Sequence, residues 1–344
     1  MQSRPRIGIM GAGAVGCYVG GRLAAAGAAE IVMVGRARQQ QELLDHGLTL
    51  RDVDGATITV AADQLGFATD ASALAECDAV LCCVKSAQTE EVAGQLAGSL
   101  GPGAIVASLQ NGVRNADTLR AGLPGREVLA AIVGFNVVGH GDGVFQRATN
   151  WPLSFEAGQS PRARALMAAL RAAGLEVDVH ANLAPHQWTK LVVNLNNAVS
   201  ALSGVPTREL ILSPAYRRII AALVDEALTV LDAAGIRPAR LRGVPLRLMS
   251  RIMRLPTPIV RLVTRAQMRI DPEARSSMWQ DLSRRRPTEV DYLNGEVVRL
   301  AGAHNASAPL NRRIVELIHA AETENVGPPD LTAVALWTQL SSPG

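Results

Sequence analysis

Aromatic residues, paired cysteines and long apolar runs are all scarce in this chain of 344 residues. Phe, Trp and Tyr together make up 3% of it, which leaves little stacking surface for nucleic-acid bases. The formal net charge of +3 is too small to indicate a polyanionic partner. No run of about 18 apolar residues occurs, so we expect no membrane span. These absences favour a protein that acts on a small molecule.

Metal, disulfide and secretion signals are also missing. The six histidines show neither an HExxH motif nor an i,i+4 pair, so we predict no metal site. The apolar stretch near the N-terminus is short and continues into a glycine motif, which is not typical of a signal peptide. The cysteines form no CxxC pair and are typical of small buried residues in a reducing compartment, so we expect a cytoplasmic protein. They are Cys17, Cys77, Cys82 and Cys83.

A GxGxxG motif follows the apolar run from Arg6 to Met10. The run predicts a strand, and the residues through Ala26 predict a helix. In such a unit the first glycine permits the turn, the second lets the backbone approach a pyrophosphate, and the third lets the helix pack on its strand. The helix dipole favours the phosphates at the helix N-terminus. A tight turn without a ligand is the alternative. The predicted cofactor residues are Gly11, Ala12, Gly13, Ala14, Val15 and Gly16.

Two continuous apolar runs, 79–84 and 104–109, are typical of strands buried on both faces of a parallel sheet. Polar residues directly after such strands lie at the carboxyl edge, where open α/β sheets bind their ligands. Lys85, Gln88 and Asn111 are therefore predicted site residues.

The pattern of strands and helices changes at about residue 181. Before it we expect further strands at 30–34, 129–138, 144–147 and 176–179, a hairpin from 48–50 and 57–60, and helices at 40–45 and 162–173. After it we expect amphipathic helices from Pro185 past Ala201, from Pro214 to Ala234, over 275–285, from Pro287, and from Pro309 to Glu322. The residues after Asn325 are expected to be loosely held. The predicted domains are 1–180, 181–326 and a tail, 327–344.

Arginines are concentrated between Arg237 and Arg269, where Pro256 and Pro258 interrupt the apolar pattern. A basic amphipathic helix suits an anionic membrane surface or a partner. Because the two prolines break the helix, we favour a solvated insertion or a subunit contact, such as that of a homodimer.

The end of the second predicted strand indicates which dinucleotide fits. NAD-binding domains place an Asp or Glu about 20 residues beyond the glycines, where it holds the ribose hydroxyls. Here Gly35 and Arg36 occupy that place, with Arg38 beside them. A guanidinium binds a 2′-phosphate, which a carboxylate would repel. We therefore predict NADP(H), with an exposed surface arginine as the alternative interpretation of Arg36.

In the second predicted domain, Lys190 and Asn194 lie one turn apart on a single helix face, and Asn197 lies close to that face. Partial burial lowers the pKa of a lysine, which suits it to donate a proton near working pH. A lysine that extends along the helix surface is the alternative.

A second polar cluster, 275–281 with 287–295, contains Ser277 and Glu289. We predict Glu289 in the first turn of a helix, where the helix dipole favours its anion. It would stabilise the helix end or accept a hydrogen bond from a substrate hydroxyl. Taken alone, the structural role is the stronger interpretation.

Six segments, in order along the chain, resemble motifs of the ketopantoate reductase family. They are 11–16, 84–88, 109–113, 188–194, 276–278 and 288–295. The resemblance implies an α/β Rossmann-type N-terminal domain and an all-α C-terminal domain like that of 6-phosphogluconate dehydrogenase, with the active site in the cleft between them. It also implies the NADPH-dependent reduction of 2-dehydropantoate to (R)-pantoate, on the route to pantothenate and coenzyme A.

The same resemblance implies roles for individual residues. Lys190 would give a hydrogen bond or a proton to the ketone oxygen, and Glu289 would assist it. Asn111, Asn194 and Ser277 would contact the substrate, while the cofactor would contact Arg36, Lys85, Gln88 and Asn111.

The chain departs from the family pattern at two places. Ala198 stands where many members have a second substrate amide, so Asn197 is its predicted substitute. The arginine-rich segment is longer than in compact members. These departures leave the exact substrate open, with another branched 2-oxo acid or an opine-type imine as the alternative. A separate alternative, from a different class of function, is an NADP(H)-binding sensor without catalysis.

Overall fold

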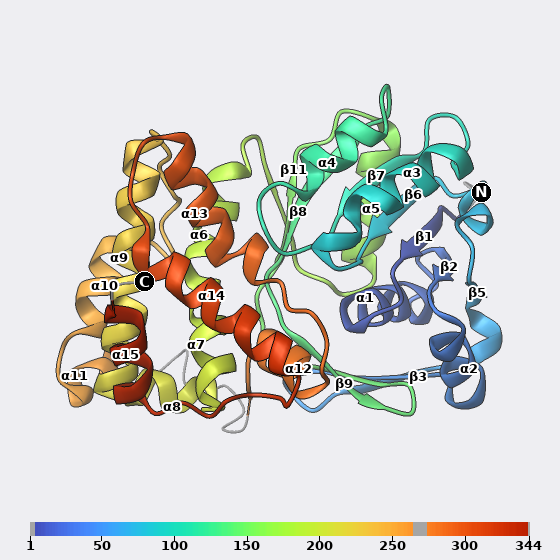
Figure 1. Cartoon of the computed structure of the whole chain (residues 1–344). Helices are drawn as coiled ribbons and strands as arrows, with labels where there is room; N and C mark the ends of the chain where they lie inside the picture. Colours follow the sequence, from blue (N-terminus) through green and yellow to red (C-terminus); the bar gives the residue numbers. More distant parts are fainter. Residues whose placement is uncertain (1–3, 264–273, 343–344) are drawn as a thin grey trace. The chain divides into compact units, whose positions relative to one another are not determined.

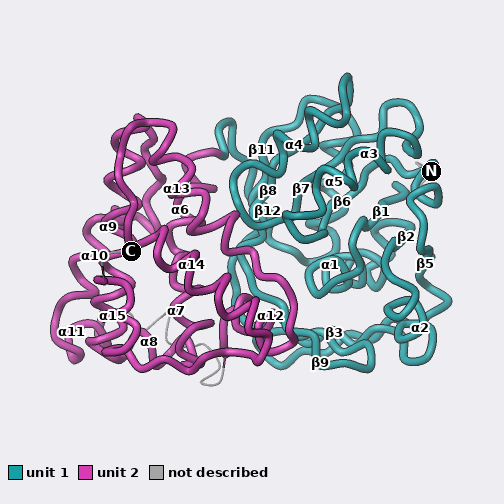
Figure 2. The backbone as a smooth tube through the Cα atoms, in the orientation of Figure 1, with its two compact units in different colours: residues 1–183 teal, residues 184–344 magenta. Residues whose placement is uncertain are grey.

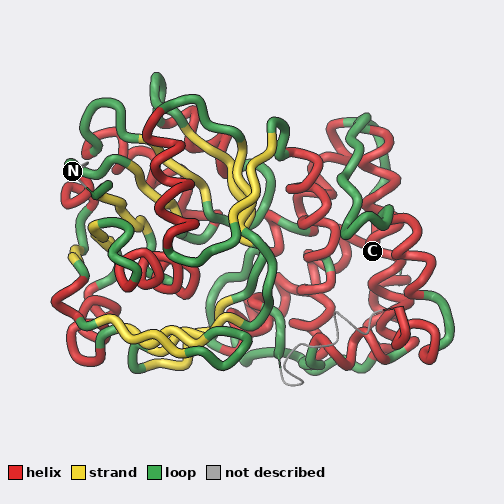
Figure 3. The backbone as a smooth tube through the Cα atoms, turned by 180° about the vertical axis from the view of Figure 1, so that it is seen from behind, coloured by secondary structure: helices red, strands yellow, loops and turns green. Residues whose placement is uncertain are grey.

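The computed structural model describes residues 4–263 and 274–342. They divide into two compact units, 1–183 and 184–344 (Figure 2). Strands are concentrated in unit 1 and helices in unit 2, as Figure 3 shows. Arg265 and Arg269, which belong to the predicted arginine-rich segment, lie outside the described residues.

Unit 1 is built on an eight-stranded sheet with the order β12-β11-β8-β7-β6-β1-β2-β5 (Figure 1). Neighbouring strands from β8 to β5 run parallel, and β11 runs antiparallel to β8. This is the predicted α/β fold with its parallel sheet. The strands are β1 (Arg6–Met10), β2 (Glu30–Val34), β5 (Gly66–Ala68), β6 (Ala79–Cys82), β7 (Ile105–Ser108), β8 (Val128–Val133), β11 (Leu153–Glu156) and β12 (Val177–His180).

Alternate residues of the central strands face opposite sides of the sheet and build two cores. On one side Ile9 and Leu81 pack with helices α1 (Ala14–Ala25) and α5 (Pro161–Ala172). On the other side Val80 and Val106 pack with α3 (Thr89–Ser99) and α4 (Asn115–Gly122). Because both faces are covered, the carboxyl edge of the sheet remains as the place where polar side chains gather.

A second sheet of four strands was only half predicted. The hairpin of β3 (Leu48–Arg51) and β4 (Thr57–Val60) is confirmed, but β10 (Val144–Arg147) and β9 (Val137–Gly141) extend it in the order β4-β3-β10-β9. The single strand predicted over 129–138 is wrong, because residues 134–136 separate β8 from β9 and send them into different sheets. Unit 1 also contains α2 (Ala37–His46) and the short turns η1 (Ala62–Gln64), η2 (Ala71–Leu74) and η3 (Ser86–Gln88).

The described residues of unit 2 form the predicted helical domain. Its longest helix, α9 (Pro214–Ala233), buries Ile219, Leu223 and Leu231, and its neighbours pack around it. The remaining elements are α6 (Ala184–Asn194), α7 (Asn196–Ser203), α8 (Thr207–Leu212), α10 (Leu246–Met253), α11 (Thr257–Val263), α12 (Ser277–Ser283), η4 (Val290–Tyr292), α13 (Asn294–Ala303), α14 (Pro309–Glu324) and α15 (Ala333–Ser341).

Two predicted helices have different bounds. The helix from Pro185 past Ala201 breaks at Leu195, because three asparagines at 194, 196 and 197 are weak helix formers. The helix predicted from Pro287 begins only at Asn294, since polar residues before it favour the turn η4.

The C-terminal tail is not loosely held. Residues 333–341 form α15, which buries Leu336 and Leu340, two side chains on one helix face. The Tyr216 hydroxyl donates to the Leu331 carbonyl at 3.1 Å, and the Arg218 guanidinium lies 5.1 Å from the ring centre of Trp337. The apolar side chains at helical spacing therefore hold the tail in place, although it begins with a Gly-Pro-Pro sequence.

The described part of the arginine-rich segment is built into unit 2 through one buried arginine. Arg217 on α9 is 1% exposed, and its guanidinium donates to the carbonyls of Met253 at 2.8 Å and Leu255 at 2.9 Å. It also donates to the carbonyls of Ile211 and Leu212 at the end of α8. A cation at the C-terminal ends of two helices is favoured by their dipoles, so Arg217 joins α8 and α10 to α9.

Candidate functional site

The glycine motif of unit 1 forms the turn from β1 into α1. Gly11 has φ +105°, and a side chain there would lie 2.8 Å from the backbone nitrogen of Val84. A Cβ on Gly16 would lie 2.3 Å from the carbonyl oxygen of Gly11, so the helix can approach the strand only with glycine at this position. A Cβ on Gly13 would meet nothing within 4 Å. The three glycines thus have the geometry of a turn, an open approach and a close contact, which suits a bound pyrophosphate.

Gln39 connects this loop to the end of β2, and the sequence interpretation missed it. Its side-chain nitrogen donates to the Ala12 carbonyl at 2.6 Å, while its oxygen accepts from the Arg36 backbone N–H at 3.2 Å. Arg36 is the N-cap of α2, and both Arg36 and Arg38 are exposed. A Gln three residues after an N-cap has the spacing of a capping box, but the N-cap here is Arg36 and not the Ser or Thr by which a sequence reveals that motif.

The polar residues predicted after β6 and β7 lie at the carboxyl edge of the sheet. Lys85 is exposed at the start of η3, Gln88 lies at its end, and Asn111 follows β7. The Ser86 hydroxyl donates to the Asn111 carbonyl at 3.1 Å, so the two segments are tied together. Lys85 and Asn111 therefore belong to one local cluster.

A buried polar network under this cluster was also missed. The Asn115 side chain donates to the Ser86 hydroxyl at 3.0 Å, and the Gln110 side chain donates to the Val84 carbonyl at 3.1 Å and to the Thr89 hydroxyl at 2.7 Å. Thr89, Gln110 and Asn115 are all buried. Satisfied buried networks fix the backbone that they touch, which here carries Lys85 and Asn111.

In unit 2, Lys190 lies on α6 and interacts electrostatically with Glu289. Burial lowers the pKa of Lys190 from 10.5 to about 8, and the negative charge of Glu289 partly opposes this change. Glu289 itself is only 7% exposed. It precedes η4, so its predicted place in the first turn of an α-helix is wrong. The structure thus brings together the two residues predicted to be catalytic, although they are 99 residues apart in sequence.

Lysine is rare in this protein. Of the 34 Lys and Arg residues, only Lys85 and Lys190 are lysines. An arginine remains charged at all accessible pH values, whereas a lysine can release its proton when it is buried. Lysine is thus kept at two of the predicted site positions, a signal that was visible in the sequence and was overlooked.

Three of the predicted substrate residues lie in unit 2, each on a different helix. Asn194 is one turn after Lys190 on α6, whereas Asn197 lies beyond the break, on α7. Ser277 is exposed at the start of α12, and the preceding Ser276 donates from its hydroxyl to the Asn197 carbonyl at 3.0 Å. Asn197 and Ser277 are therefore neighbours, and Ala198 is fully buried.

The cysteines, possible metal ligands and possible membrane helices limit the chemistry that the protein can perform. Burial raises the pKa of Cys17 and Cys82 to about 12 and that of Cys77 to about 11, so these thiols are inert. Within 4–263 and 274–342 no three His, Cys, Asp or Glu side chains are arranged to hold a metal ion. In the same residues, no helix has the length and apolarity that a bilayer crossing requires.

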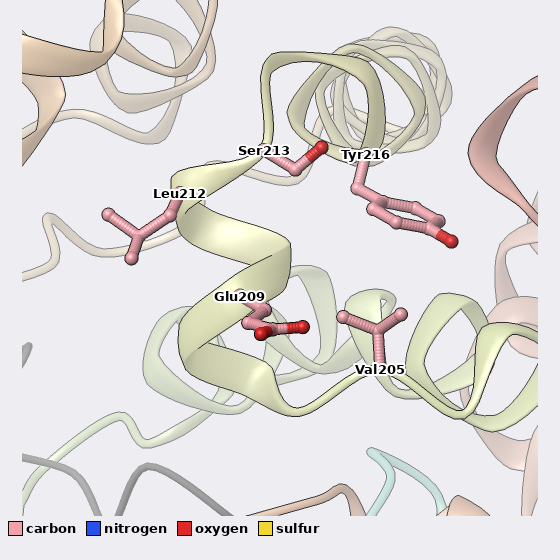
Figure 4. Close-up of a pocket in the computed structure, with 5 residues that line it drawn as sticks. All are labelled: Val205, Glu209, Leu212, Ser213 and Tyr216. Carbon is pink, nitrogen blue, oxygen red and sulfur yellow. The ribbon is translucent and has the colours of Figure 1, made fainter.

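A pocket of about 460 Å³ in unit 2 lies at the junction of α8 and α9 (Figure 4). The carboxylate of Glu209 points toward Val205 in this view. None of the predicted site residues contributes to the pocket, so we assign it no part in the reaction. Its lining residues are Val205, Glu209, Leu212, Ser213 and Tyr216.

Comparison with known proteins agrees with the two-unit structure. Residues 7–160 match the family model for ketopantoate reductase PanE/ApbA, and residues 182–322 match the model for the C terminal part of the same family. A crystal structure of a PanE/ApbA family ketopantoate reductase from Ralstonia eutropha JMP134 is 32% identical, with a TM-score of 0.79, and the match covers 93% of this chain and 99% of that one. The chain belongs to the ketopantoate reductase family.

Two further proteins match this chain over nearly the full length. The 2-dehydropantoate 2-reductase of Halobacterium salinarum is 29% identical over 328 residues, which cover 93% of this chain and 99% of the relative. A D-mandelate dehydrogenase solved with NADH and anilino(oxo)acetate is 23% identical with a TM-score of 0.74, over 93% of this chain and 99% of that one, and shares the fold. The protein is accordingly an NAD(P)H-dependent oxidoreductase.

Proposed function

We propose that this protein reduces 2-dehydropantoate to (R)-pantoate with NADPH. The observation that carries the proposal is the pair of half-buried Lys190 and buried Glu289, in which the pKa of Lys190 falls to about 8. Such a lysine is charged at neutral pH and still gives up its proton readily. A sensor that only binds a dinucleotide has no need of this pair.

The cofactor would be held by unit 1. Its pyrophosphate would bind at the open Gly13 position and the N-terminus of α1, and Arg36 with Arg38 would bind the 2′-phosphate. The residue after β2 is glycine and the next is arginine, so no carboxylate is present there to repel that phosphate. Lys85, Gln88 and Asn111 would contact the rest of the cofactor from the carboxyl edge of the sheet.

The bound NADPH supplies a hydride to the keto carbon of the substrate. As the negative charge develops on the keto oxygen, the Lys190 ammonium donates its proton to that oxygen, and the product is the alcohol. Lys190 is then neutral and takes a new proton from solvent. Glu289 favours the charged form of Lys190, so the lysine is protonated again before the next turnover.

The substrate would be oriented by amide and hydroxyl groups. We assign this role to Asn194, Asn197 and Ser277 in unit 2 and to Asn111 in unit 1. The arrangement of Asn197 next to α12 supports its use in place of the amide that Ala198 lacks. Since this departure changes one polar contact, a different branched 2-oxo acid or an imine remains the alternative substrate.

The proposal is tested by following NADPH oxidation with 2-dehydropantoate and with a panel of other 2-oxo acids, each alone and mixed with an amine that would form an imine. The same assays are run with NADH in place of NADPH. We expect 2-dehydropantoate to give the highest kcat/KM and NADPH to be preferred over NADH. Lys190→Arg keeps the charge but cannot release a proton, so it should lose at least about a hundredfold in kcat, as should Lys190→Ala. Tight NADPH binding with no turnover of any compound would instead establish the sensor.

We further propose that the protein is a cytoplasmic homodimer. Several large apolar side chains on and between α10 and α11 are exposed, and such a face is typical of a subunit contact. A ketopantoate reductase from Staphylococcus aureus is described as dimeric. Light scattering during gel filtration will give the mass, and a monomer at micromolar concentration would contradict the proposal. The exposed residues are Leu248, Leu255, Ile259 and Leu262.

A further inference from the structure

Glu289 is buried without being part of an α-helix. It directly precedes η4, a turn of three residues, and the residue after that turn, Leu293, has φ −115° and ψ −88°. Its backbone is engaged by the hydrogen bond of this short turn, from the Tyr292 N–H to the Glu289 carbonyl at 3.1 Å, and not by an α-helix. A neighbouring element adds contacts to the chain on either side of Glu289.

That element is α14, which contacts the chain on both sides of Glu289. On the N-terminal side, the backbone N–H of Thr288 donates to Oε1 of Glu322 at 2.7 Å. On the C-terminal side, Nε2 of His319 lies 2.9 Å from Oδ1 of Asp291. Nδ1 of His319 lies 2.9 Å from Oε2 of Glu322, so the two residues of α14 also bind each other. One i,i+3 pair thus holds the residue before Glu289 and the second residue after it.

The chemistry of the pair defines its charge. Both ring nitrogens of His319 face carboxylate oxygens, which only accept hydrogen bonds when they are ionised. A neutral imidazole has a single N–H, so only the imidazolium can satisfy both contacts. The arrangement is one cation between the two anions Asp291 and Glu322.

The helix that carries the pair is itself rigidly packed. Ile314 and Ile318 of α14 are fully buried, and Asn311 near its start donates to the Glu226 carboxylate at 2.9 Å. Glu226 in turn accepts from the backbone N–H groups of Leu310 and Asn311. A contact from α14 is therefore a fixed reference point for the Glu289 segment.

We propose that His319 and Glu322 form an anchor that positions Glu289 with respect to Lys190. The inference rests on the proposed function, in which Glu289 assists the proton donor. His319 and Glu322 act on Glu289 through Thr288 and Asp291, so both are positioning residues. When the anchor is removed, residues 288–292 gain freedom, and a displacement of about 1 Å in a catalytic group costs up to about a hundredfold in rate.

The kinetic test compares four variants with the full-length enzyme. His319→Ala should lower kcat about tenfold. The KM for NADPH should stay within about twofold, because the predicted cofactor residues belong to unit 1 and His319 belongs to unit 2. Glu322→Gln keeps an acceptor for Thr288 and loses the charge, so its effect should be smaller. His319→Lys should restore most of the lost kcat, since an ammonium can donate to both carboxylates. The matched control is Glu316→Gln, which removes a carboxylate of the same helix that pairs with Arg313 at 2.8 Å.

Hydrogen exchange provides a readout that does not depend on activity. We expect amides of residues 288–292 to exchange faster in His319→Ala than in the wild type, while those of β1 and α1 are unchanged. Wild-type kcat in His319→Ala, or unchanged exchange at 288–292, would overturn the anchor. An equal loss in His319→Ala and Glu316→Gln would also overturn it. An inactive wild type would instead overturn the proposed function, so the two failures are distinguishable.

Discussion

The side-chain amide of Gln39 donates to the Ala12 carbonyl at 2.6 Å and accepts from the Arg36 N–H at 3.2 Å. One residue thereby links the glycine loop, proposed to hold the pyrophosphate, to the arginine proposed to hold the 2′-phosphate. The space for this link is narrow, because a Cβ on Gly35 would lie 3.2 Å from the Gln39 oxygen and 2.9 Å from the Ala12 Cβ. Two parts of one cofactor site are therefore held at a fixed spacing.

Gln39→Leu should weaken NADPH binding through this link. The loss of two hydrogen bonds with a net value of about 1 kcal/mol each predicts a rise of up to about thirtyfold in the Kd for NADPH. The preference for NADPH over NADH should also fall, because the backbone of Arg36 loses its contact. Fluorescence titrations with NADPH and with NADH measure both effects. Gln41→Leu is the control, since Gln41 lies on the same helix and its side chain donates to the exposed Asp45. An equal effect of the two substitutions would refute the link.

The lowered pKa of Lys190 can be measured directly because the chain has only two lysines. In protein labelled with ¹³C at the lysine ε-carbon, the NMR spectrum should contain two side-chain signals, and Lys190→Met assigns them. We expect the Lys190 signal to titrate at about pH 8. The rate constant kcat/KM should decline above that pH, since the neutral amine has no proton to donate. Titration near pH 10.5 with an activity that stays flat to pH 9 would contradict the role of Lys190 as the proton donor.

Arg217 predicts a large effect on stability. It is 1% exposed and donates to carbonyls of α8, α10 and the residues beyond α10. Arg217→Met fills a similar volume but leaves these carbonyls buried without a donor, which should lower the free energy of unfolding by about 3 kcal/mol. Urea denaturation followed by circular dichroism measures the change. Arg218→Met, the adjacent exposed arginine, should cost much less. A difference of under about 1 kcal/mol between the two would show that water replaces the lost donor.

The sequence was sufficient for the features that depend on local pattern. The apolar runs predicted β6 and β7, the glycine spacing predicted the turn into α1, and the helical domain followed from amphipathic periodicity. Contacts between residues that are distant in sequence could not be predicted in this way. Nothing in the pattern around 288–292 indicates that α14 holds this segment, and the link from Asn115 to Ser86 joins residues 29 apart. Such contacts depend on which faces meet in the folded chain, and single-sequence periodicity carries no information on that.

The His319 contacts predict how stability changes with pH. Burial lowers the pKa of His319, but hydrogen bonds with Glu322 and Asp291 outweigh it, so the pKa is raised above 6.5. A raised pKa means that the stabilisation is complete below about pH 6.5 and is lost as the pH rises through the folded-state value. Burial raises the pKa of Glu322, but hydrogen bonds with Thr288 and His319 outweigh this effect and lower it, so the change in this pH range is assigned to His319. The melting temperature of the wild type should therefore exceed that of His319→Ala by more at pH 5.5 than at pH 9. The melting-temperature difference between the wild type and Glu316→Gln should stay constant over the same range. A difference between the wild type and His319→Ala that increases with rising pH would contradict the placement of an imidazolium between two carboxylates.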